Sequence, residues 1–304
     1  MGKEKIIKFN LYLGLGIILI AEFLLLIKIP FIRSWFFSIC WWSYILIMDS
    51  LNYRRKGYSL IFLKTKEFFF MAFISVFTWL IFEAINLRLN NWTYHNLPLN
   101  ITERWLGYFI AYATVIPALW ETATFIESLL LRKKFPTLVH IPQFFTLPLI
   151  FIGILFFILF LLYPRYFFPL VWLCFIFLIS PLNYKFKIKG IIDYLNEGDY
   201  GKIISWLLAG LWAGILWEFW NYWALSRWQY SIPYFNFLKI FEMPMLGYFG
   251  FPPFALEVLA FYNLFSYIKE RIKPYPLLKW TAVFLLLVID LICFKLIDLY
   301  TWIK

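Results

Sequence analysis

Four glutamates inside apolar segments are the residues whose type and spacing could do chemistry. Asn86 follows Glu83 by three residues, and Asn221 follows Glu218 at the same spacing. Residues three apart share a face of a helix, so each amide could donate to its carboxylate or hold a bound ligand. A carboxyl group at the centre of a membrane span costs about 2.5–3.5 kcal/mol and usually faces the bundle interior.

Each of the other two glutamates lies four residues after a proline. Pro117 precedes Glu121, and Pro253 precedes Glu257. We expect the prolines to interrupt their helices and to free backbone carbonyls near the carboxyl groups. A carboxyl group shielded from water favours its protonated form, which makes it a usable general acid.

Aromatic residues follow each Glu–Asn pair. Trp92 and Tyr94 come after the first pair, and Trp228 and Tyr230 come after the second. Aromatic faces could stabilise a carbocation, so the pattern suggests an acidic pocket near the outer leaflet, roofed by these four side chains. A structural interpretation is also open. The Glu–Asn pairs would then join helices, and Trp and Tyr would belong to the interfacial aromatic belt.

These groups are parts of an internal repeat. Its elements recur in the same order, and the distance between the two glutamates of a half differs by a single residue. The matched pairs are Leu51-Asn52-Tyr53 with Leu182-Asn183-Tyr184, Glu83 with Glu218, Asn86 with Asn221, Trp92-Thr93-Tyr94 with Trp228-Gln229-Tyr230, Leu106-Gly107-Tyr108 with Leu246-Gly247-Tyr248, Pro117 with Pro253, and Glu121 with Glu257. Units with four spans each should be parallel, related by an axis along the membrane normal. We predict repeats at 1–135 and 136–273, and an added helix at 274–304.

The composition explains what must position these residues. Hydrophobic residues make up 63% of the 304 and charged ones only 15%, whereas a soluble domain has about 25% charged residues. The sequence therefore predicts an all-α polytopic membrane protein, because continuous runs of about 20 apolar residues fit helical spans. We expect nine spans, near 9–30, 35–51, 67–88, 105–131, 144–163, 166–182, 203–225, 246–268 and 278–301.

Lysine and arginine gather in alternate connections, which indicates the orientation. The N-terminus, the second-to-third, fourth-to-fifth, sixth-to-seventh and eighth-to-ninth connections are basic, and they fall on one side if there are nine spans. The basic residues are Lys3, Lys5, Lys8, Arg54, Arg55, Lys56, Lys64, Lys66, Arg132, Lys133, Lys134, Lys185, Lys187, Lys189, Lys202, Lys269, Arg271 and Lys273. This predicts a cytoplasmic N-terminus and an outside C-terminus, in a prokaryotic plasma membrane.

Several classes of protein are excluded by missing patterns. No segment combines a basic face with exposed aromatics, so nucleic acid is not an expected partner. Nucleotide-binding glycine motifs, a P-loop, a nucleophile elbow and H-E-x-x-H are absent, and we expect no cofactor. His95 and His140 are too few for a histidine-rich di-iron site. Three cysteines without C-x-x-C do not predict a zinc site, and we expect no metal.

The order of acid, Asn, Trp-x-Tyr, Gly and then Pro before Glu resembles the lycopene cyclase domain of the small, non-flavin, membrane-embedded type. The resemblance covers about 45–130 and 175–268, with Pro-x-x-x-Glu here in place of the family's Pro-x-Glu-Glu. It implies paired helical units that cyclise carotenoid ends by protonation. It would place Glu121 and Glu257 at the suspected acid site, and Glu83/Asn86 and Glu218/Asn221 at the acidic-Asn position.

Two main hypotheses follow from the sequence. The first is a carotenoid-cyclase-like protein that acts on a long isoprenoid or similar lipid through intramembrane glutamates, with Trp92, Tyr94, Trp228 and Tyr230 binding the substrate. The second is a non-catalytic, proton- or cation-coupled transporter or a lipid-binding protein. A structural partner in a larger complex is a third alternative, and the oligomeric state, including a homo-oligomer, is open.

Overall fold

The computed structural model describes residues 2–130, 135–234 and 236–304. Helices dominate the fold. Its first half contains α1 (Lys3–Leu26), α2 (Pro30–Lys56), α3 (Leu60–Leu63), α4 (Thr65–Leu89), β1 (Trp92–His95), α5 (Ile101–Tyr112) and α6 (Val115–Leu129). The rest contains η1 (Gln143–Phe145), α7 (Thr146–Leu162), α8 (Pro164–Phe167), η2 (Phe168–Leu170), α9 (Val171–Lys185), α10 (Ile191–Asn196), α11 (Tyr200–Trp223), β2 (Arg227–Tyr230), β3 (Lys239–Ile240), β4 (Met243–Pro244), η3 (Met245–Gly250), α12 (Phe251–Ile272), α13 (Pro276–Tyr300) and β5 (Trp302–Ile303).

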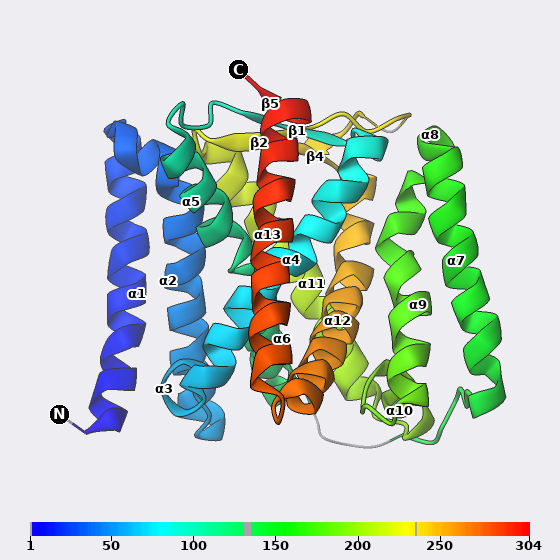
Figure 1. The fold of residues 1–304 in the computed structure, drawn as a ribbon. Helices are drawn as coiled ribbons and strands as arrows, with labels where there is room; N and C mark the ends of the chain where they lie inside the picture. The colour runs from blue at the N-terminus through cyan, green and yellow to red at the C-terminus, as the bar shows by residue number, and fades with distance from the viewer. Residues whose placement is uncertain (1, 131–134, 235) are drawn as a thin grey trace.

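Eight helical segments of the described chain are long and apolar enough to cross a membrane. They are Glu4–Leu26, Pro30–Lys56, Thr65–Leu89, Ile101–Leu129, Gln143–Leu162, Pro164–Lys185, Tyr200–Trp223 and Met245–Ile272. The protein is therefore an integral, multi-pass, all-α membrane protein. Helix α13 has 25 residues and extends over the same height as these spans (Figure 1). The two termini lie at opposite ends of the bundle, as nine crossings require.

The spans predicted from the sequence differ from the helices in three places. The second and sixth are longer than expected, because α2 begins at Pro30 and the Pro164–Lys185 segment includes α8 and η2. The fourth is not one helix, since the chain breaks between α5 and α6 at Ala113–Thr114. Together, α5 and α6 still have the length and apolarity of one span.

The prolines do mark interruptions of the predicted spans, but they lie in the first turn of the helix that follows and not within a helix. Pro117 is the third residue of α6, and Pro253 is the third residue of α12. A proline in a first helical turn loses no hydrogen bond that the helix would make. The prolines therefore stand where helices begin, and the helices run uninterrupted through Glu121 and Glu257.

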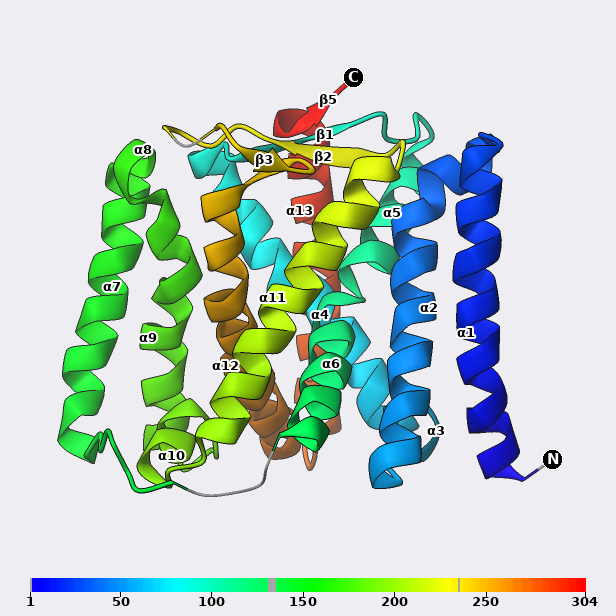
Figure 2. The same cartoon turned by 180° about the vertical axis from the view of Figure 1, so that it is seen from behind.

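The helices are arranged with a pair at each edge and the others between them. Helices α1 and α2 pack together at one edge, and α7 and α9 pack at the opposite edge (Figures 1 and 2). Between them, α6 packs on α2 and α11, while α12 packs on α9 and α11. Outward side chains of the edge helices are large and apolar, such as Leu19 at 66% exposure and Phe151 at 68%. Lipid is the solvent that suits such a surface.

The basic connections lie at one end of the bundle. The α2–α4, α9–α11 and α12–α13 connections lie at the end that carries the N-terminus (Figure 1). Arg132, Lys133 and Lys134 of the fourth-to-fifth connection lie outside the described residues. Acidic residues join helices at this end. Glu127 accepts from Lys202 at 2.7 Å and from Lys56 at 3.3 Å, and Glu67 pairs with Lys269 at 2.7 Å.

A small sheet lies across the other end. Strand β1 pairs antiparallel with β2 and parallel with β5 (Figures 1 and 2). In the β1–β2 register Trp92 faces Tyr230 and Tyr94 faces Trp228, so Thr93 and Gln229 stand at the centre. The equivalents Thr93 and Gln229 face each other, and on either side of them a Trp of one half faces the Tyr of the other. The sheet therefore has the two-fold character that parallel repeats predict, although the boundaries 1–135, 136–273 and 274–304 stay a prediction.

Candidate functional site

The two repeat asparagines anchor the central strands. Asn86 donates to the Trp92 carbonyl at 2.9 Å and accepts from the Asn91 and Trp92 backbone amides at 2.8 and 3.3 Å. Asn221 likewise donates to the Trp228 carbonyl and accepts from its amide, both at 2.9 Å. Neither amide donates to its neighbouring glutamate, although the three-residue spacing had suggested that it could. Both are fully buried and fix the turn from helix to strand.

Glu83 accepts three hydrogen bonds on one oxygen. The donors to Oε1 are the indoles of Trp79 at 2.8 Å and Trp92 at 3.1 Å, together with the Tyr94 hydroxyl. The side chain is 1% exposed, and its Oε2 has no partner among the described residues. Three donors on one buried oxygen stabilise negative charge there.

Glu218 occupies the equivalent place with fewer donors. Its Oε1 accepts from the Tyr230 hydroxyl at 2.8 Å, and its Oε2 has no partner within the described chain. The indole nitrogen of Trp228, the equivalent of Trp92, is also unpartnered there. Gly214 stands where the first half has Trp79, four residues before the glutamate. With one donor in place of three, Glu218 is the less stabilised of the two as a carboxylate.

The two tyrosines that bond these glutamates lie in β1 and β2, beyond the helix ends. Burial, followed by the charge of the neighbouring glutamate, raises the pKa of both Tyr94 and Tyr230 well above its ordinary value. Both phenols therefore keep their protons at any physiological pH. The Tyr112 hydroxyl in turn donates to that of Tyr94 at 3.0 Å. In the first half, Tyr112, Tyr94 and Glu83 are therefore linked by successive hydrogen bonds.

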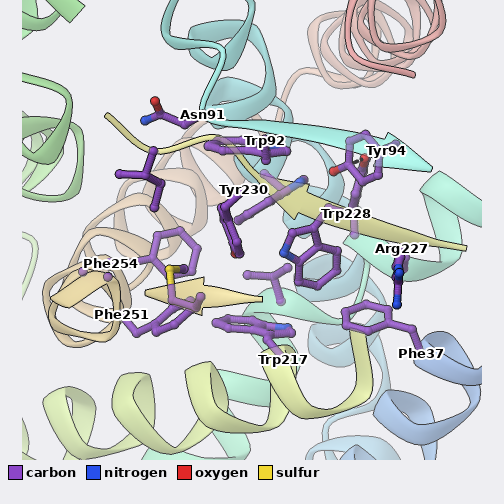
Figure 3. A pocket seen from close by; sticks show the side chains of 18 of the residues that line it. Phe37, Asn91, Trp92, Tyr94, Trp217, Arg227, Trp228, Tyr230, Phe251 and Phe254 are labelled. Carbon is purple, nitrogen blue, oxygen red and sulfur yellow. Dashed lines mark hydrogen bonds between the residues drawn. The ribbon is translucent and has the colours of Figure 1, made fainter. Parts of the chain in front are cut away.

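A cavity of about 500 Å³ lies beneath the β1–β2 pair, between the two halves. Trp92, Tyr94, Trp228 and Tyr230 all line it, as the sequence had suggested (Figure 3). Most of its wall is apolar and aromatic, with further contributions from Phe37, Trp79, Trp172, Trp217, Phe251 and Phe254. Cavities of this kind hold small apolar ligands.

The predicted acidic pocket is wrong in one respect. No aspartate or glutamate is among the described residues that line the cavity. Glu83 and Glu218 lie one hydrogen bond behind the wall, where Tyr94 and Tyr230 separate them from the cavity. The wall is thus mostly apolar, and Tyr94 and Tyr230 stand between the cavity and these two carboxyl groups.

Glu121 and Glu257 lie elsewhere in the bundle. Glu121 is fully buried and accepts from the Asn52 amide, so it joins α6 to α2. Glu257, also fully buried, accepts from the Phe175 backbone amide at 2.8 Å and so joins α12 to α9. Neither lines the cavity, so the structure does not bring the four glutamates together. Asn52 and Asn183 are conserved in position between the halves and each reaches a backbone carbonyl on the facing helix.

Several residues around the site were missed by the sequence analysis. Trp79 and Trp217 line the cavity from α4 and α11, and the ring of Phe254 lies 5.9 and 5.8 Å from theirs. For Trp79, the spacing of four residues from Glu83 could have indicated a shared helix face. Trp217 is one residue from Glu218, and its spacing gave no such signal.

A buried ion pair attaches α13 to the first half. Arg104, which lines the cavity, donates from Nε and Nη2 to Asp298, each at 2.7 Å. Asp298 also accepts from Trp105 at 2.9 Å and Tyr108 at 3.1 Å. Two turns earlier on α13, both carboxylate oxygens of Asp290 have no partner among the described residues.

His95 does not line the cavity. It contacts the Thr93 hydroxyl at 3.0 Å, and burial, followed by the nearby Arg227, lowers its pKa. Within the described chain no group of three or more His, Cys, Asp or Glu residues could hold a metal ion.

Comparisons with known proteins add no relative. A scan of family models, a search of curated proteins and a search of solved structures each find no match. The resemblance to the lycopene cyclase domain therefore stays an expectation from the residues alone.

Proposed function

We propose that this protein binds a long isoprenoid or similar apolar lipid in the cavity and acts on it by acid catalysis. The observation that supports this most is the aromatic cavity between the halves, with Glu83 and Glu218 each one hydrogen bond behind its wall. The cavity lacks charged carboxylates on its surface, which suits a hydrocarbon. Aromatic faces lower the energy of a carbocation formed inside it.

The two glutamates have different parts in this proposal. Glu218, with one donor and a free Oε2, is the better proton source. Glu83, with three donors on Oε1, is the better permanent charge to stabilise a cation. Pairs of carboxyl groups in unlike environments divide acid and base work in this way. Glu121 and Glu257 hold helices together, and we no longer place the acid there.

The reaction implied by the resemblance is an isomerisation. A proton adds to a terminal double bond, the cation closes a ring, and a proton leaves a neighbouring carbon. The substrate and product have the same mass, and no electron carrier is needed. The aromatic wall excludes water, which would otherwise add to the cation.

The test is expression in a host that accumulates an acyclic carotenoid. We expect an isomer of unchanged mass that absorbs at shorter wavelength. Glu218→Gln should lower its yield about 100-fold or more, the usual scale for a lost general acid. Glu83→Gln should retain part of the activity. Normal turnover in both variants, with equal amounts of inserted protein, would contradict the proposal.

A non-catalytic lipid-binding or proton-coupled transport function is the second candidate. The observation in its favour is that two of the four glutamates are occupied in helix contacts and none lines the cavity. It predicts that lipid co-purifies with the protein chemically unchanged, and that Glu218→Gln binds as the wild type does. Appearance of the isomer in the wild type alone would decide against it.

For orientation we propose a cytoplasmic N-terminus and an outside C-terminus, in a prokaryotic plasma membrane. The basic connections at the N-terminal end of the bundle support this, because cytoplasmic loops carry an excess of Lys and Arg. The cavity and β-sheet would then lie toward the outer leaflet. A tag after Lys304 should be accessible from outside intact cells, and protection of that tag would reverse the assignment.

A further inference from the structure

The most exposed part of the cavity wall lies on one side. Of the described residues that line it, just four are exposed: Pro169, Leu173, Leu246 and Phe249. Their exposed fractions include 36% for Leu173, 53% for Leu246 and 74% for Phe249. All four belong to the second half. The opening, which we call the mouth, lies where η2 and the start of α9 face η3.

The mouth faces lipid and not water. Both of its edges belong to membrane spans, Pro164–Lys185 and Met245–Ile272, and its exposed residues are apolar. One rim is a close contact of the same two segments. A Cβ atom at Gly250 would lie 3.0 Å from Trp172 Cδ1, so α9 and the η3–α12 junction leave no free width there. A hydrocarbon chain is the occupant that such an opening fits.

The first half has no matching opening. There the six-residue η3 is replaced by the twelve-residue α5. Helix α5 is held to α2 by the Trp35–Glu103 hydrogen bond at 3.3 Å and to α13 by the Arg104–Asp298 pair. Leu106, the equivalent of Leu246, is 51% exposed but does not line the cavity. The longer helix therefore closes the side that the shorter one leaves open.

We infer that an isoprenoid chain enters this cavity sideways from the bilayer, through the mouth between η2–α9 and η3, one end at a time. This inference rests on the proposed binding of an isoprenoid. With a single mouth, a molecule longer than the cavity keeps its remaining length in the lipid. A two-ended isoprenoid must then leave and return before its second end is treated, so product altered at one end accumulates first.

Tryptophan substitutions at two equivalent positions test the entry route. Leu246→Trp places an indole in the mouth, and Leu106→Trp is the matched control, with the same residue, a similar exposure and no contact with the cavity. The probe is geranylgeraniol with a diazirine at its hydrocarbon end, incorporated into vesicles that hold the full-length protein. After irradiation, mass spectrometry locates the labelled peptides.

We expect cavity peptides containing Trp172, Trp217 or Phe251 to be labelled in the wild type and in Leu106→Trp. In Leu246→Trp their labelling should fall about tenfold, since the indole occupies the entry. Thermal stability of the three proteins in detergent shows whether each is folded. If Leu246→Trp folds and is labelled as the wild type is, the mouth is not the entry, although the proposed binding stands. If Leu106→Trp lowers labelling equally, entry is not one-sided. No cavity labelling in the wild type would overturn the proposed binding itself.

Discussion

The halves contain the same acid, amide and aromatic residues, but they pack differently around them. In the first half Trp79 lies four residues before Glu83, and Val115 lies two before Pro117. In the second half Gly214 and Phe251 take these places, and a Cβ at Gly214 would overlap the Phe251 ring. The first half thus has a large residue on α4 and a smaller one on α6, whereas the second half has a small residue on α11 and a large one on α12.

This difference shows how two similar halves can place their equivalent glutamates in different surroundings. Each half has one large ring at this place, although Trp79 with Val115 is bulkier than Gly214 with Phe251. The chemistry differs, because Trp79 brings an indole N–H to Glu83 and Phe251 brings nothing polar to Glu218. One packing choice thus gives one carboxylate with three donors and one carboxyl group with a single donor. The same half that keeps the second glutamate less stabilised also contains the mouth.

The largest expected effect concerns α13, whose Asp298 joins it to Arg104, Trp105 and Tyr108 of the first half. Asp298→Ala would leave Arg104 buried without its partner, and we expect unfolding to become easier by about 3–5 kcal/mol. Pro244, at the matching place two residues before Leu246, carries no charge and needs no such partner. Thermal denaturation in detergent measures the effect. A variant as stable as the wild type would show that α13 is not held by this ion pair.

Two substitutions in the second half would reproduce the first-half arrangement of a large residue before the glutamate and a smaller one before the proline. Gly214→Trp alone should destabilise the protein by about 1–3 kcal/mol or more, because the indole has no room beside Phe251. Adding Phe251→Val should recover most of that loss and bring an indole toward Glu218. Isomer formation should then fall in the folded double variant. Full activity in the double variant would show that the number of hydrogen-bond donors at Glu218 does not affect its role as an acid.

The smallest difference should be between the two asparagines. Asn86→Ala leaves two backbone amides and a carbonyl without a partner, and Asn221→Ala leaves one amide and one carbonyl. With about 1–3 kcal/mol for each buried group left unsatisfied, the first loss should exceed the second by the cost of one group, about 1–3 kcal/mol. Equal melting temperatures would mean that water or movement of the strands compensates in the first half.

The sequence alone determined the class of the protein and the residues of the repeat. Apolar runs about 20 residues long and alternating basic loops are local features of the sequence. They suffice to indicate the class because a bilayer is crossed by apolar helices and cytoplasmic loops are enriched in Lys and Arg. The repeat also identified Asn86 and Asn221, and the aromatic residues of the cavity wall at Trp92, Tyr94, Trp228 and Tyr230. These positions depend only on the order of residues along the chain.

Only the tertiary structure decided which glutamates lie near the cavity and on which side it opens. Glu83 and Glu121 look alike in sequence, because each is an acid within an apolar run. Their surroundings come from other elements, since Trp92 and Tyr94 of β1 bond Glu83 and Asn52 of α2 bonds Glu121. The mouth likewise depends on the distance between η2 and η3, segments far apart in the chain. Contacts between distant residues carry no periodic signal, so they cannot be predicted from the pattern of a single sequence.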